Sequence, residues 1–258
     1  MKGVQYALNK LGALSNVYTY VDVAHSGWLG WDSNFTPFVN LMGTLAGGLT
    51  KGFNGIDGII SNTANTTPTT EPYMTANQQI GGQPVRSATF FQWNQYIDDQ
   101  PYVLALRTAL IAKGYPSTLG ALIDTSRNGW GGSARPTGPS TSTDLNTFVN
   151  ASRIDRRPAK GDWCNQNGAG LGSRPTANPV AGMDAYVWIK PPGESDGASQ
   201  AIPNDQGKGA DPMCDPSYPG NSLNNNSPTN ALPNAPLSGA WFEAQFEQLV
   251  QNAYPAVS

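Results

Sequence analysis

Short apolar strands alternate with helical segments along this chain, and this alternation constrains its fold more than any other feature. The predicted helices span residues 4–14, 38–49, 102–113 and 239–253, and the predicted strands span residues 17–23, 58–61, 119–123 and 185–189. Strands separated by helices pair in parallel. Four strands are too few to close a barrel, which takes about eight. The sequence therefore predicts one α/β domain over residues 1–258, with an open half-barrel or the C-terminal part of a larger fold.

Charge is concentrated in residues 184–197, where the last predicted strand ends. Residues 185–189 are apolar or aromatic, and two prolines and a glycine then break the strand. Lys190, Glu194 and Asp196 follow within seven residues, in a chain that is only 13% charged. Charged groups at the carboxyl ends of parallel strands are typical of α/β active sites. The alternative is a solvated turn whose charges have no chemical role.

Polar and aromatic residues also follow the other strands. Asp22, His25, Trp28 and Trp31 come directly after the first strand, in a spacing that suits hydrogen bonding and stacking. One histidine without neighbouring cysteine or histidine makes a poor metal site, so we expect no metal. The alternative for the two tryptophans is burial in the core.

Asp124 and Arg127 follow the third strand. Arg127 can hold a carboxylate with two parallel hydrogen bonds, or it can form a surface ion pair of little energetic value.

Composition excludes several functions. The formal charge is −3 and no basic block occurs, which argues against a nucleic-acid partner. No apolar run reaches the roughly 18 residues of a membrane span, and the first residues contain no secretory leader. No nucleophile elbow or phosphate-binding glycine loop is present, so we expect no cofactor. Cys164 and Cys214 are the only cysteines, and the residues alone leave a disulfide and two free thiols equally open.

Carboxylates, tryptophans and amides remain, and their motifs resemble family 6 glycoside hydrolases, the inverting cellulases. The resemblance extends in the family's order from about residue 15 to the C-terminal helix. Its five motifs are Asp-Val-Ala-His-Ser-Gly-Trp-Leu-Gly-Trp at 22–31, Asp-Thr-Ser-Arg-Asn-Gly at 124–129, Gly-Asp-Trp-Cys-Asn at 161–165, Gly-Leu-Gly-Ser-Arg-Pro-Thr at 170–176 and Val-Trp-Ile-Lys-Pro-Pro-Gly-Glu-Ser-Asp-Gly at 187–197. The family's fold is a distorted parallel β/α barrel, of which this chain resembles the C-terminal portion without the N-terminal strands.

The resemblance implies a role for each matching residue. Asp196 is the expected catalytic base, and Arg127 and Lys190 keep it ionised because nearby positive charge favours a carboxylate. Cys164 and Cys214 are expected to form a disulfide that anchors the loop 198–236. The expected sugar-stacking residues are Trp28, Trp31 and Trp163, and the expected hydrogen-bonding residues are Asp22, His25, Asn62, Lys190 and Glu194.

The family's activity sets further expectations. A long loop 198–236 resembles the loop that roofs the tunnel of cellobiohydrolases, which favours release of cellobiose from non-reducing ends of cellulose by a secreted monomer. Inversion also needs a general acid on the opposite face of the sugar. The family carries that acid in a motif like Ile-Glu-Pro-Asp-Ser, which does not occur here because only about twenty residues precede Asp22. We therefore expect the acid upstream of this chain; the alternatives are a chain that only binds β-glucan, an endo-acting glucanase, or a structural domain without glucan affinity.

Overall fold

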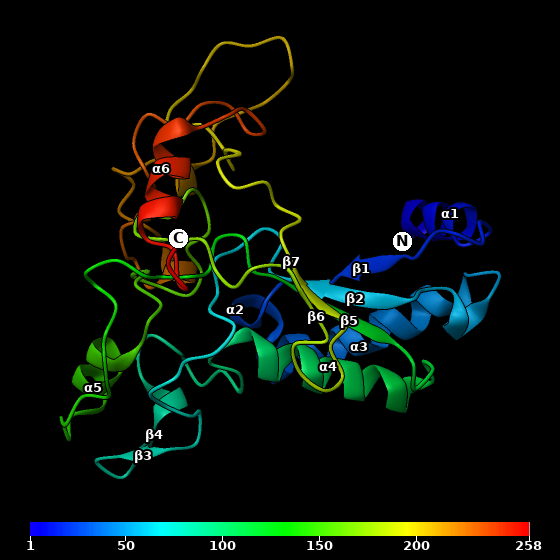
Figure 1. Cartoon of the computed structure of the whole chain (residues 1–258), viewed down its shortest axis with the longest axis horizontal. Helices are drawn as coiled ribbons and strands as arrows, with labels where there is room; N and C mark the ends of the chain where they lie inside the picture. Colours follow the sequence, from blue (N-terminus) through cyan, green and yellow to red (C-terminus); the bar gives the residue numbers. More distant parts are fainter. Residues whose placement is uncertain (258) are drawn as a thin grey trace.

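A five-stranded sheet lies at the centre of the computed structural model, which describes residues 1–257 (Figure 1). Its strands, in spatial order, are β1 (Tyr20–Asp22), β2 (Gly58–Ser61), β5 (Gly120–Asp124), β7 (Ala185–Val187) and β6 (Thr176–Ala177). The first four are parallel, and β6 runs antiparallel beside β7. The predicted α/β fold with a parallel sheet is therefore confirmed. Over residues 1–257 the sheet stays open, and the two-residue strand β6 was not predicted because it is too short to show periodicity.

Two long helices cover one side of this sheet. The α-helices are α1 (Lys2–Leu11), α2 (Ser26–Leu29), α3 (Asp32–Gly47), α4 (Asp99–Lys113), α5 (Leu145–Ser152) and α6 (Glu243–Gln251). Figure 1 shows α3 and α4 side by side along the sheet. The main core lies between the sheet and these two helices. In it, Ile59 and Ile123 of the strands pack in one cluster with the fully buried Leu106 and Leu110 of α4. No helix within residues 1–257 is long and apolar enough to cross a lipid bilayer.

Helices α3 and α4 begin earlier than predicted, and each contains a proline. Helix α4 begins three residues before the predicted start, because Pro101 lies in its first turn, where no intrahelical donor is needed. Gly114, with φ of +126°, ends this helix as predicted. Helix α3 begins at Asp32 and includes Pro37, so the predicted start at residue 38 was wrong.

Strand β7 is two residues shorter than predicted for a specific reason. The backbone N–H groups of Ile189 and Lys190 donate to Oδ2 of Asp124, at 2.9 and 2.7 Å, instead of to a neighbouring strand. Helix α6 is also shorter than predicted, since Glu194 forms an isolated antiparallel bridge with Trp241. Both departures therefore come from pairing between segments that are distant in sequence.

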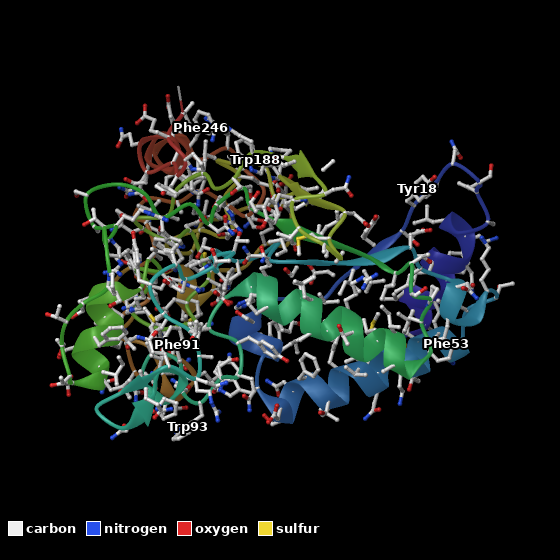
Figure 2. All side chains as sticks on the ribbon, turned by 60° about the horizontal axis from the view of Figure 1, so that its bottom comes forward. Tyr18, Phe53, Phe91, Trp93, Trp188 and Phe246 are labelled. Carbon is white, nitrogen blue, oxygen red and sulfur yellow. A yellow bond between two sulfur atoms is a disulfide. The ribbon has the colours of Figure 1, made fainter. Side chains whose placement is uncertain are left out.

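A second, smaller hydrophobic core lies beside the sheet and was not predicted. It contains the buried Phe90, Phe91, Leu145, Phe148 and Val149, and Figure 2 labels Phe91 in this part of the molecule. Around it lie the hairpin β3 (Gln79–Ile80) and β4 (Gln83–Pro84) and the helix α5. The N-cap of α5 is Asp144, whose Oδ1 accepts the N–H of Thr147 at 2.8 Å.

The loop 198–236 contains no α-helix or strand. Two of the four 3₁₀ turns lie in it: the turns are η1 (Gly52–Asn54), η2 (Val85–Ser87), η3 (Pro212–Cys214) and η4 (Ser222–Asn224). A backbone hydrogen bond attaches the end of the loop to the segment after α5, where Leu232 N donates to Asn165 O at 2.9 Å. A bond from Asn224 Nδ2 to Asp162 Oδ1, at 3.0 Å, attaches its middle. The loop is thus held to the residues that follow α5.

Candidate active site

Asp196 lies just beyond β7, after a turn that requires glycine. Gly193 has φ of +86°, which is the left-handed region. Asp196 then pairs with Asn165: Asn165 N donates to Asp196 Oδ2 at 2.8 Å, and Asp196 N donates to Asn165 Oδ1 at 2.8 Å. These two bonds hold the carboxylate at a defined place between the segments that contain the two residues.

Two cations contact the Asp196 carboxylate. Arg127 Nη1 donates to Oδ1 at 2.8 Å and to Oδ2 at 2.7 Å. Lys190 Nζ lies 3.2 Å from Oδ1. The side chains of Arg127 and Asp196 are only 2% and 6% exposed, so water screens this ion pair weakly. Two cations from different segments therefore fix the position of this buried carboxylate.

Hydrogen bonds of Asp124 position Arg127 and Lys190 next to Asp196. Asp124 Oδ1 accepts the N–H of Ser126 at 2.8 Å, and its Oδ2 accepts the N–H groups that follow β7. The ends of β5 and β7 are thereby tied together, which places Arg127 next to Lys190 and Asp196. Burial raises the pKa of Asp124 despite these hydrogen bonds.

Glu194 lies at the edge of this cluster. Its Oε1 is 2.9 Å from Lys190 Nζ, and its side chain is 37% exposed. Lys190 therefore bridges the two carboxylates of Glu194 and Asp196. An ion pair this exposed contributes little to stability, so Glu194 is available to contact a ligand.

A hollow of about 360 Å³ lies beyond the carboxyl ends of β1 and β2. Five residues predicted to bind substrate line it: Asp22, His25, Trp28, Asn62 and Trp163. Trp163 is two residues from Asn165, which holds Asp196, so the wall of this hollow is continuous with the carboxylate cluster. Arg127, Lys190, Glu194 and Asp196 do not themselves line the hollow.

A second hollow of about 410 Å³ adjoins the first, since both contain Gly27, Trp28 and Gly161. Trp31 lines this second hollow, and its Nε1 donates to Gln92 O at 2.8 Å. Ser222 and Leu223 of the loop 198–236 lie on the same hollow. Leu223 is 85% exposed, so the middle of the loop presents an apolar side chain near Trp28 and Trp31.

The polar groups around the first hollow differ in how far the protein already uses them. Asn62 Nδ2 donates to Thr67 O and to Asp124 O, each at 3.0 Å, and its Oδ1 accepts Thr67 N at 3.1 Å. Its amide is therefore engaged with backbone. His25 is buried, and burial, followed by the charges of Arg157 and Lys160, holds the pKa of its imidazole well below its usual range. The imidazole is consequently neutral.

Cys164 and Cys214 form the disulfide that the resemblance implied. The bridge links the residue after Trp163 to the turn η3 of the loop 198–236. It therefore connects the wall of the first hollow to the loop. No group of histidine, cysteine and acidic side chains in residues 1–257 is arranged to hold a metal ion.

Sequence reasoning missed Asn165 and a buried charged network behind the first hollow. Asn165 lies inside one of the family motifs, but its bond to Asp196 could not be seen from spacing. The network contains Glu71, Asp155, Arg157 and Lys160, all of them buried. The only sequence signal was the unusual run Arg-Ile-Asp-Arg-Arg at 153–157 in a chain with few charges.

An open parallel sheet with tryptophan-lined hollows and a buried, cation-bound carboxylate at its carboxyl edge is the arrangement of α/β enzymes. The sequence profile described as "Glycosyl hydrolases family 6" matches residues 1–253. The chain therefore belongs to glycosyl hydrolase family 6, as its motifs indicated.

Curated relatives agree with this assignment. "Exoglucanase A" of Cellulomonas fimi is 53% identical over 99% of this chain and 30% of its own length. "Probable 1,4-beta-D-glucan cellobiohydrolase C" of Aspergillus niger is 33% identical over 97% of this chain and 43% of its own length. "Putative endoglucanase type B" of Fusarium oxysporum is 31% identical over 97% of this chain and 43% of its own length. The chain thus spans less than half the length of these relatives.

Solved structures show the same fold. The catalytic domain of Cellulomonas fimi Cel6B superimposes with a TM-score of 0.97 at 52% identity, over 100% of this chain and 59% of that one. The catalytic core domain of the cellobiohydrolase Cel6A from Chaetomium thermophilum gives a TM-score of 0.69 at 29% identity, over 98% of this chain and 56% of that one.

Proposed function

We propose that this chain takes part in inverting hydrolysis of β-1,4-glucosidic bonds in cellulose, with release of cellobiose from non-reducing ends. Asp196 acts as the base that activates water, and Arg127 and Lys190 support its charge. The general acid belongs to a segment that precedes residue 1 in a longer polypeptide. That segment also supplies strands beside β1, so that the open sheet is the C-terminal portion of a distorted β/α barrel.

The observation that carries this proposal is the environment of Asp196. The carboxylate of Asp196 is only 6% exposed and forms ion pairs with Arg127 and Lys190. It adjoins an aromatic hollow through Asn165 and Trp163. Inverting glycosidases need such a group to take a proton from water, while an acid 6.5–9.5 Å away protonates the leaving oxygen, by the general geometry of this reaction.

The two hollows would bind the glucan. Trp28, Trp31 and Trp163 offer flat apolar faces on which sugar rings stack. Asp22, His25 and Asn62 add polar groups to the first hollow, although the amide of Asn62 is already hydrogen-bonded to the backbone. Lys190 and Glu194 would contact the glucan from the adjoining carboxylate cluster. The three aromatic side chains line two adjoining hollows, so we propose that one glucan chain contacts all three.

Exo action is supported by the loop 198–236, whose Ser222 and Leu223 line the second hollow and would help to enclose a chain. The names of the Cellulomonas fimi and Aspergillus niger relatives point the same way. An endo-acting glucanase is the second candidate, favoured by the name of the Fusarium oxysporum relative. The disulfide fits a secreted protein, and we propose a monomer without cofactor.

The test uses swollen cellulose and cellotetraose. We expect the polypeptide that includes the preceding segment to release cellobiose. Asp196→Ala should lose this activity, and the exposed control Glu243→Gln should retain it. Near-full turnover by Asp196→Ala would refute the base assignment. Random shortening of the polymer, without cellobiose as the main product, would select the endo alternative. Cellotetraose binding without any product would leave only a glucan-binding role.

A further inference from the structure

We propose that Arg157 is a positioning residue that orients the hydroxyl of Thr67, so that His25 carries its proton on Nε2 and presents it to the first hollow. The value of this donor for a sugar hydroxyl rests on the proposed function. The tautomer itself does not, because it follows from hydrogen bonds within the chain.

Asn65 Oδ1 has two lone pairs that can accept hydrogen bonds. One accepts the N–H of Thr66 at 2.8 Å. The other accepts a hydrogen bond from Nη1 of Arg157. Both lone pairs of Asn65 Oδ1 are therefore already used by donors that cannot turn away, since one is backbone and the other is a buried guanidinium.

The hydroxyl of Thr67 has two candidate acceptors. Its Oγ1 lies 3.1 Å from Asn65 Oδ1 and 3.0 Å from His25 Nδ1. Arg157 Nη2 donates to the same oxygen at 3.2 Å. Because Arg157 also occupies Asn65, the single proton of Thr67 is directed to the remaining acceptor, His25 Nδ1. Arg157 thus orients the Thr67 hydroxyl in two ways: it donates to Oγ1 of Thr67, and it occupies the competing acceptor Asn65 Oδ1.

A second donor converges on the same ring nitrogen. The backbone N–H of Gly27 donates to His25 Nδ1 at 3.1 Å, which caps the short helix α2. An imidazole nitrogen that accepts hydrogen bonds carries no proton, so the neutral ring must carry it on Nε2. Both hydrogen bonds of the His25 ring within residues 1–257 are at Nδ1, and His25 lines the first hollow. The proton-bearing nitrogen is thus left for a ligand.

Arg157 is itself rigidly held, as a positioning residue must be. Its side chain is 0% exposed, and Asp155 accepts from Nε at 2.9 Å and from Nη2 at 2.6 Å. Asp162 O accepts the second N–H of Nη1 at 2.9 Å, and Lys160 O lies 3.3 Å from the same nitrogen. The guanidinium therefore joins the segment after α5 to Asn65 and Thr67 on the segment after β2.

His25 is the only histidine in the sequence, which makes the test direct. The ring is labelled with ¹⁵N in the full chain, and the two nitrogens are distinguished by their shifts and by which of them shows a directly attached proton. We expect the proton on Nε2 across neutral pH. A proton on Nδ1 in the wild-type chain would overturn the proposal without any variant.

Variants separate Arg157 from its surroundings. Arg157→Met frees one lone pair of Asn65, so the Nδ1 resonance should move toward the protonated position. The matched control Arg156→Met should not move it, because Arg156 bonds Ile154 O and Asn150 O instead. If Arg157→Met does not fold, Thr67→Val takes its place as the test. Thr67→Val should weaken the preference of the His25 proton for Nε2, whereas Thr67→Ser, which keeps the hydroxyl, should preserve it. An unchanged spectrum in a folded Arg157→Met or in Thr67→Val would refute the role.

The consequence for binding is measured separately with cellotetraose. Loss of one neutral hydrogen bond weakens binding by about 2- to 10-fold, so Arg157→Met and Thr67→Val should raise the dissociation constant within that range, and Thr67→Ser should not. Failure of the wild-type chain to bind cellotetraose would refute the proposed function and leave the tautomer assignment standing. If the wild-type chain binds cellotetraose but carries the His25 proton on Nδ1, the tautomer assignment is refuted and the proposed function stands.

Discussion

Nη1 of Arg127 donates to both carboxylate oxygens of Asp196, at 2.8 and 2.7 Å, so one nitrogen carries the buried ion pair. The other guanidinium nitrogens, Nε and Nη2, are buried and have no hydrogen-bond partner among residues 1–257. Lys190 provides the second positive charge, 3.2 Å from Oδ1. The position of Asp196 therefore depends on two cations that come from the ends of different strands.

Breaking this pair should be costly. Arg127→Met leaves Asp196 buried with Lys190 alone, and we expect the free energy of unfolding to fall by about 3 kcal/mol. Asp196→Asn should also destabilise, because it leaves Arg127 buried without a counter-charge. The double variant should cost less than the sum of the two single variants, since no isolated charge remains. Urea unfolding of the four proteins measures this, and additive losses would contradict the coupling.

Trp28 and Trp130 should respond in opposite ways to replacement by alanine. Trp28 is 65% exposed on the hollows, so its loss should weaken cellotetraose binding with less than about 1 kcal/mol change in stability. Trp130 is 0% exposed, and its loss should cost about 3–5 kcal/mol of stability. Fluorescence titration and urea unfolding give the two readouts. Unchanged binding by Trp28→Ala would remove Trp28 from the glucan site.

The disulfide should stabilise both the fold and the wall of the first hollow. It closes a loop with a sequence separation of 50, and its loss in Cys164→Ser/Cys214→Ser should cost about 2–4 kcal/mol. Cellotetraose binding should weaken too, because Cys164 lies between Trp163 and Asn165. Wild type treated with reductant should match the double variant in unfolding experiments. If reductant leaves the stability of the wild type unchanged while the double variant is destabilised, the serine substitutions and not the loss of the disulfide cause the change.

The contribution of Glu71 to stability should fall as pH rises toward about 8. Burial raises the pKa of this carboxyl from 4.5 to about 8, although the N–H groups of Ile154 and Asp155 oppose the change. A group with a raised pKa binds its proton more tightly in the folded protein, so its contribution is complete below pH 4.5 and is lost through about pH 8.

Glu71→Gln should remove part of this slope, which for one group is at most about 1.4 kcal/mol per pH unit. Asp98, whose pKa burial raises to about 6, adds a loss of the same sign at lower pH and should remain in the variant. The exposed Glu243→Gln serves as control and should keep the full slope. Free energies of unfolding at pH 5, 6, 7 and 8 check the expectation, and equal slopes in all three proteins would show that Glu71 ionises normally.

Many local features were predictable because they depend on neighbouring residues. The apolar runs around Ile59, Ile123 and Tyr186 identify parallel strands, and Gly114 marks the end of α4. The polar residues after the strands mark the carboxyl edge of the sheet, where the first hollow lies. The family motifs point to Asp196 and Trp163, because spacing within a motif survives changes elsewhere in a chain.

Other features depend on contacts between distant residues and left no local signal. The shortening of β7 follows from Asp124, and the second core joins Phe91 to Phe148 across more than fifty residues. Trp28 and Trp130 look alike in the sequence, yet one is exposed and the other is fully buried.

The sequence by itself determined the alternation of helix and strand, the charged turn after the last parallel strand and membership of the family, since each depends on residue types at short spacing. Only the tertiary structure decided which groups meet: Asn165 bonds Asp196, Thr67 lies between Arg157 and His25, and Leu223 lines the same hollow as Trp28. Hydrogen bonds and burial form between segments that the chain brings together only when it folds, so their partners cannot be read from order along the chain.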